Sequence, residues 1–89
     1  MELKQVEKIA KALSDHNRLL ILKAIRANKG NLDCSAIVNS IELAQPSISH
    51  HIKKLVEADI ILPHKEGRFY SYSINEDLLS RYVTTLKEL

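Results

Sequence analysis

The amino-acid sequence predicts a mainly α-helical domain that carries one β-hairpin near its C-terminal end. Up to residue 57, apolar residues recur three and four positions apart, which is typical of amphipathic helices. From residue 61 the spacing changes to two, which is typical of β-strands. The chain has 89 residues, of which 45% are hydrophobic, and this is enough for one globular domain spanning residues 1–89.

A polar segment, "SDHN", separates the first two predicted helices. Ser14 or Asp15 can cap the second helix by accepting a backbone N–H. The second helix, "RLLILKAIRAN", is so apolar that we place it at the centre of the core. We expect it to stop at Gly30, because glycine readily adopts the left-handed conformation that ends a helix. The first helix carries an apolar stripe formed by Leu3, Val6, Ile9, Ala10 and Leu13.

Two further helices follow, joined by the tight turn "ELAQ". Asp33 can cap the short helix "CSAIVNSI". Pro46 suits the first turn of the next helix, where the N–H that proline lacks would be unpaired anyway. The apolar stripes are Ile37, Val38 and Ile41 on the short helix, and Ile48, Ile52, Leu55 and Val56 on the longer one.

The hairpin comes next, and a last helix follows it. In the hairpin, Tyr70, Tyr72 and Ile74 alternate with Phe69, Ser71 and Ser73. Gly67 can supply the positive φ of a tight turn at "KEGR". Asn75 can cap the last helix, and the acidic residues of its first turn, Glu76 and Asp77, oppose the helix dipole favourably. Four helices, a hairpin and a helix are the order of a winged helix-turn-helix domain.

The segment "QPSISHHIKKL" raises the question of what its polar face binds. Opposite the apolar face lie Pro46, His50, Lys53 and Glu57, flanked by Ser47 and Lys54. Hydroxyls and an imidazole suit base edges or phosphates in a major groove, and lysines suit contacts with the DNA backbone. An ordinary solvated helix face is the alternative. The helix-turn-helix before this face and the charged hairpin after it favour DNA.

Metal binding and catalysis find little support in the sequence. His50 and His51 are adjacent in a helix and point about 100° apart, so they cannot both face one ion. We expect His51 to pack at the edge of the buried face and to hydrogen-bond across the turn. Cys34 is the only cysteine, and it is either core filler or a reactive thiol. The absence of a phosphate-binding glycine loop, a nucleophile elbow or a carboxylate pair argues against an enzyme.

Neither a secretory signal nor a membrane span is evident in the sequence. Charged residues interrupt the N-terminal segment every few positions, and no apolar run is long enough to cross a membrane. We therefore expect a cytoplasmic protein with no membrane partner.

Three stretches, "KALSDHNRLLILKAI", "QPSISHHIKKLVEADII" and "KEGRFYSYSI", resemble the signature stretches of the ArsR/SmtB family of repressors, in the family's order and spacing. The most specific part is Ser49 to Ile52, which is similar to the family's pattern of serine, any residue, histidine and leucine, and Leu55 follows as the next leucine. The resemblance implies a homodimer, formed through the first and last helices, that binds a double-stranded, inverted-repeat DNA operator.

The resemblance also implies roles for particular residues. Gln45, Ser47, Ser49 and His50 would approach the major groove, Lys53 and Lys54 would hold phosphates, and Lys65 and Arg68 would contact DNA from the hairpin. The dimer interface would consist of two stripes that otherwise lie exposed on a small protein. They are Leu3, Val6, Ala10 and Leu13 on the first helix, and Leu79, Tyr82, Leu86 and Leu89 on the last.

The chain departs from the family where many members bind their signal. Many have a cysteine, any residue, cysteine motif at the start of the third helix, but here Asp33 and Ser35 occupy the two cysteine places around Cys34. Other members bind zinc through Asp and His on the last helix, which has no histidine here. We therefore predict no family metal site and no cofactor. Three signals stay open: oxidation of a thiol switch at Cys34, an unrecognised ligand between the subunits, or none. The alternative function is a protein-interaction module or a nonspecific architectural DNA binder.

Overall fold

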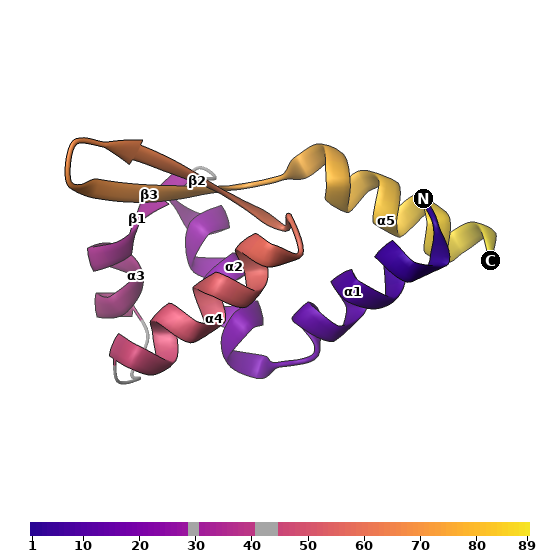
Figure 1. Cartoon of the computed structure of the whole chain (residues 1–89), viewed down its shortest axis with the longest axis horizontal. Coiled ribbons are helices and arrows are strands. Elements are labelled where there is room, and N and C mark those ends of the chain that lie inside the picture. Colours follow the sequence, from indigo (N-terminus) through magenta and orange to yellow (C-terminus); the bar gives the residue numbers. More distant parts are fainter. Residues whose placement is uncertain (29–30, 41–44) are drawn as a thin grey trace.

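The computed structural model describes residues 1–28, 31–40 and 45–89 and confirms the predicted winged helix-turn-helix order, with one strand added (Figure 1). The elements are α1 (Leu3–Leu13), α2 (His16–Ala27), β1 (Asn31–Asp33), α3 (Cys34–Ser40), α4 (Gln45–Glu57), β2 (Ile61–Glu66), β3 (Phe69–Ile74) and α5 (Glu76–Glu88). The predicted turn "ELAQ" falls almost wholly on residues 41–44, outside the described residues.

Of the two predicted caps for α2, Asp15 is the one that forms. Its carboxylate accepts the N–H of Asn17 at 2.8 Å, whereas the hydroxyl of Ser14 donates back to the carbonyl of Lys11. At the other end, Asn28 caps α2 directly after Ala27. The predicted stop at Gly30 lies outside the described residues.

The strand β1 is absent from the sequence-based prediction, which gave a hairpin alone. It pairs antiparallel with β3, so the sheet has the order β1-β3-β2. Three residues are too few to reveal a period of two, which is why the sequence gives no sign of this strand. Asp33 ends the strand and, as predicted, caps α3 by accepting the N–H of Ala36 at 2.7 Å. β1 therefore ties the base of the hairpin to the start of α3.

The core lies between the helices and one face of the sheet. Its largest fully buried side chains are Ile9, Ile21, Ile25, Ile37, Ile48, Leu55, Ile60 and Ile61. On α4, Ile48, Ile52 and Leu55 are buried, which confirms the predicted apolar face. Fully burying one such side chain stabilises the fold by about 1.5–3 kcal/mol. The three together fix the rotation of α4 about its axis.

The C-terminal end of α4 is closed by a Schellman motif. The N–H of Ile60 bonds to the carbonyl of Leu55 at 3.0 Å, and the N–H of Asp59 bonds to that of Val56 at 2.9 Å. This motif places Asp59 in the left-handed region, with φ 61°, where glycine is the usual residue.

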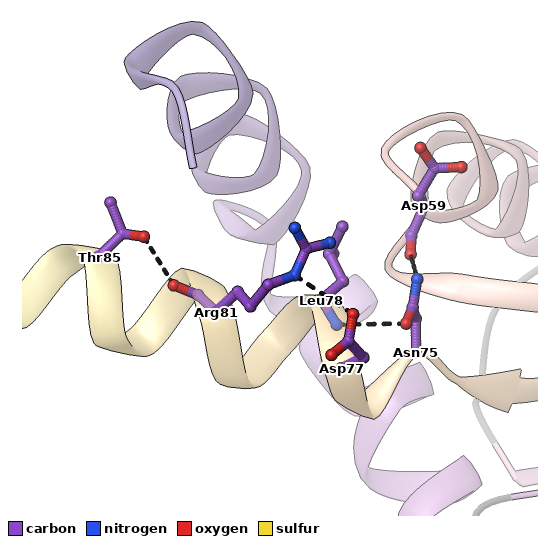
Figure 2. Close-up of polar contacts among 6 residues, drawn as sticks. All are labelled: Asp59, Asn75, Asp77, Leu78, Arg81 and Thr85. Carbon is purple, nitrogen blue, oxygen red and sulfur yellow. Dashed lines mark hydrogen bonds and ion pairs between the residues drawn. The ribbon is translucent and has the colours of Figure 1, made fainter.

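Asn75 joins this turn to the start of α5, as Figure 2 shows. Its amide nitrogen donates to the carbonyl of Asp59 at 2.9 Å, and its amide oxygen accepts the N–H of Leu78 at 3.2 Å. The predicted cap is confirmed, and one side chain holds both helix ends. Further along α5, Arg81 pairs with Asp77 at 3.2 Å (Figure 2).

A second link holds α5 to α2. The guanidinium of Arg26 donates to both carboxylate oxygens of Glu76, at 2.6 and 2.8 Å. This hydrogen bonding, together with the charge of Arg26, lowers the pKa of Glu76 below its ordinary value of 4.5. The same contact raises the pKa of Arg26.

We expect Asp59→Gly to stabilise the protein by about 1 kcal/mol, because glycine adopts the left-handed conformation without the steric penalty of a Cβ. Urea unfolding at a fixed protein concentration measures the effect. Asp59→Ala is the matched control and should not exceed the wild type, since alanine keeps the Cβ. A glycine variant no more stable than the wild type would show that this turn is unstrained.

We expect the Arg26–Glu76 pair to stabilise the fold above pH 4.5 and to lose that effect as the pH falls through the lowered pKa of Glu76. The reason is that a depressed carboxyl pKa leaves the folded state with fewer bound protons than the unfolded state. The unfolding free energies of wild type and Glu76→Gln should therefore differ near neutral pH and converge in acid. Asp77→Asn, which changes a carboxylate in the same helical turn, is the control. A difference that is constant with pH would contradict this assignment.

Candidate nucleic-acid interface

The outward face of α4 is polar and exposed over its whole length. Ser47, Ser49, His50 and Lys53 are all exposed, opposite the buried apolar face. Gln45 is the first residue of α4, but its side chain lies outside the described part of the chain. Apart from Gln45, the α4 residues predicted to approach DNA are therefore all exposed.

Lys54 lies beside this surface and pairs with Glu57, with 3.7 Å between ammonium and carboxylate. Both side chains are exposed, and an exposed pair of this kind contributes only about 0–1 kcal/mol. Lys54 would therefore lose little free energy if it left Glu57 and paired with a DNA phosphate.

The two adjacent histidines have different surroundings. His50 is exposed, whereas His51 is half-buried and its Nδ1 accepts a hydrogen bond from Nε of Arg18 at 3.1 Å. Arg18 also donates to the carbonyl of Ala12 at 3.3 Å. The packed role predicted for His51 is confirmed, but its partner belongs to α2 and does not lie across the turn. Arg18 thus joins α1, α2 and α4, a role that its place within an apolar helix did not reveal.

Asp15 adds a negative charge to this junction. Desolvation raises the pKa of its carboxyl, but the hydrogen bonds from the backbone N–H groups of Asn17 and Arg18, together with the charge of Arg18, outweigh it, so the net shift is downward. The cap of α2 and the polar anchor of α4 therefore form one electrostatic cluster.

The hairpin of β2 and β3, the wing, has its turn where the sequence predicts it. Gly67 has φ 61°, and Glu66 pairs with Phe69 to close a two-residue turn. Arg68 is exposed at the tip, and Lys65 is exposed beside it. The tip and the first turn of α4 both lie toward the end of the molecule away from the termini (Figure 1).

The predicted dimer stripes are only partly exposed. Leu3, Ala10, Leu86 and Leu89 are exposed, and Leu13, Leu79 and Tyr82 are half-buried against the core of their own chain. The exposure predicted for Val6 is wrong. It is only 7% exposed, because it turns toward the core together with Ile9, and it adds almost nothing to a surface.

Two residues of α5 were assigned no role from the sequence. Leu78, left out of the predicted stripe, is the residue of α5 that enters the core, and Val83, also left out, is exposed. Near the termini, α1 and α5 lie against each other (Figure 1).

Other predicted features are less fully described. Cys34 opens α3, but its side chain lies outside the described residues, so the thiol switch stays a prediction. Within residues 1–28, 31–40 and 45–89, no group of three or more His, Cys, Asp or Glu side chains could hold a metal ion. In the same part of the chain, no helix is both long and apolar enough to cross a membrane.

These elements define a class of protein. A second helix that buries Ile21 and Ile25 in the core, a helix pair α3 and α4 with an exposed polar face, and a basic hairpin tip form a winged helix-turn-helix DNA-binding domain.

Comparison with known proteins gives the family. Residues 15–61 match the family described as "Bacterial regulatory protein, arsR family". The HTH-type transcriptional regulator MJ1325 of Methanocaldococcus jannaschii is 36% identical over 81 residues, which are 91% of this chain and 90% of that protein. The arsenical resistance operon repressor of Staphylococcus aureus is 31% identical over 97% of this chain and 81% of its own.

A solved structure supports the same family assignment. The homodimeric winged helix-turn-helix domain of Mb0332 from Mycobacterium bovis, described as a possible ArsR-family regulator, superposes with a TM-score of 0.78 at 25% identity, covering 94% of this chain and 77% of that one. The chain belongs to the ArsR family of DNA-binding transcriptional regulators and is not an enzyme.

We expect His51→Leu to lower the free energy of unfolding by about 1–3 kcal/mol, because it leaves the part-buried Nε of Arg18 without its acceptor. Its neighbour provides the matched control, since His50→Leu should stay within about 0.5 kcal/mol of the wild type. Thermal or urea unfolding measures both. Equal effects of the two substitutions would show that the Arg18 contact does not anchor α4.

Proposed function

We propose that residues 1–89 form one domain of a homodimeric repressor, which binds an inverted-repeat operator with α4 of each subunit in the major groove and the wing against the flanking backbone. Such a regulator would work in the cytoplasm, where the DNA is.

One observation carries this proposal: α4 buries Ile48, Ile52 and Leu55 and leaves hydroxyl, imidazole and ammonium groups on the opposite side. A helix held in this way can present polar groups to base edges without adjusting its own packing. Lys53 and Lys54, further along, suit the phosphates that fix register on the duplex. Arg68 at the wing tip supplies a cation at a second point.

The dimer is supported by apolar side chains that the single chain leaves uncovered. Leu3 on α1, Val83 and Leu86 on α5, and Leu89 directly after it are exposed. Both helices reach the end of the molecule that holds the two termini (Figure 1). Large exposed apolar groups gathered in one region favour association. The homodimeric Mycobacterium bovis domain gives a precedent for pairing in this fold.

Each subunit has a single cysteine, so one subunit alone cannot bind arsenite through several thiolates. One relative is an arsenical resistance operon repressor, and from it we infer only DNA binding for this chain, not a response to arsenic. Oxidation of Cys34, a ligand between the subunits, or no effector remain the candidates.

A binding titration on the DNA upstream of the protein's own gene tests the proposal. We expect far tighter binding to an inverted repeat there than to competitor DNA, with a steep loss of affinity as salt rises. Repeating the titration with zinc, arsenite and a thiol oxidant examines the signal. Equal affinity for operator and competitor would favour the architectural binder, and no DNA affinity would favour the interaction module.

Substitutions on the two proposed DNA contacts should differ in kind. The double variant Ser47→Ala and His50→Ala should weaken operator binding by roughly 1–3 kcal/mol for each lost base contact. Its binding to random DNA should weaken much less. Arg68→Ala should weaken binding to operator and random DNA alike. It should also reduce the slope of log K against log salt concentration by about 0.9 for each lost phosphate contact. Lys87→Ala, at the opposite end of the chain, controls for net charge. Unchanged operator affinity in the first two variants would refute these contacts.

A further inference from the structure

The wing has two faces of different character, and the strand register defines them. Residues directly opposite each other in an antiparallel pair share a face. The inner face consists of Ile61, Pro63 and Lys65 on β2, paired with Ile74, Tyr72 and Tyr70 on β3. The outer face consists of Leu62, His64 and Glu66, paired with Ser73, Ser71 and Phe69.

The inner face continues outward from the core. At its base, Ile61 and Ile74 are buried, and the next residue of β3 on this face, Tyr72, packs against the core cluster. At its outer end, Tyr70 is 44% exposed and faces Lys65. This end of the inner face therefore projects beyond the core as an aromatic and cationic surface.

Lys65 and Tyr70 contact each other directly. The ammonium Nζ of Lys65 lies 5.7 Å from the centre of the Tyr70 ring, within the range of a cation–π interaction. This contact restrains a flexible lysine beside a hydroxyl group. A phosphate oxygen at this point would meet both a positive charge and an O–H donor.

The outer face offers the opposite charge at the same level of the wing. There Glu66 is paired with Phe69, which is 78% exposed. A carboxylate repels phosphate, and a phenyl ring has no donor to offer it. Charge complementarity therefore selects the inner face for the DNA backbone.

We propose that Tyr70 is a DNA-binding residue, whose hydroxyl donates a hydrogen bond to a backbone phosphate that Lys65 neutralises. The wing approaches DNA with its inner face, and Phe69 points away from it. This inference rests on the proposed DNA-binding function and adds a residue that the sequence analysis did not assign.

Two aromatic neighbours on opposite faces provide the test. Tyr70→Phe removes only the hydroxyl, and Phe69→Ala removes a larger, fully apolar group. Fluorescence anisotropy on labelled operator DNA should show about tenfold weaker binding for Tyr70→Phe and less than about twofold change for Phe69→Ala. Lys65→Ala should also weaken binding, and it should reduce the slope of log K against log salt concentration by about 0.9 for each lost phosphate contact.

The same loss should appear on random-sequence DNA, because phosphates carry no sequence information. Operator affinity of Tyr70→Phe equal to the wild type, or a loss for Phe69→Ala as large as that for Tyr70→Phe, would overturn the assignment. A wild type that shows no operator preference, with Tyr70→Phe still weaker on every DNA, would instead refute sequence-specific regulation and leave the phosphate contact standing.

Discussion

Burial of one face of α4 is the constraint on which the rest of the structure depends. Ile48, Ile52 and Leu55 have less than one tenth of their surface exposed. Rotating the helix would expose these side chains and bury serines and lysines without partners, which costs several kcal/mol. The polar face is therefore held outward by the core, and the surface that we propose to bind DNA is formed before DNA arrives.

Two polar links connect this helix to other elements, and a third joins α5 to α2. Arg18 fixes His51 on α4 to α1 and α2, Asn75 ties the turn after α4 to α5, and Arg26 holds Glu76 at the start of α5 to α2. The helices expected to form the dimer are thus linked to the helix expected to bind DNA. These contacts, together with the packing of α4 in the core, give a physical route by which a change at the surface between subunits would reach α4.

The sequence alone predicts the helices, a cap of α2 at Ser14 or Asp15, the caps at Asp33 and Asn75, and the Gly67 turn, because each depends on local periodicity or on one side chain bonded to a neighbouring N–H. It predicts the exposed face of α4 for the same reason. It misses β1 and the partner of His51, because strand pairing and the Arg18 bond join residues far apart in the chain. The misplaced Val6 has a related cause: an amphipathic pattern shows that a face is apolar, but not whether its own chain or a partner covers it.

Hydroxyl-radical footprinting of the wild-type protein on DNA carrying the inverted repeat tests the central claim most directly, because it reads the geometry of the bound dimer. Two α4 helices related by a two-fold axis should protect two equivalent patches, with centres about one helical turn, roughly 34–36 Å, apart, and the wings should extend each patch outward. A single patch, or protection that is the same on unrelated DNA, would contradict the account.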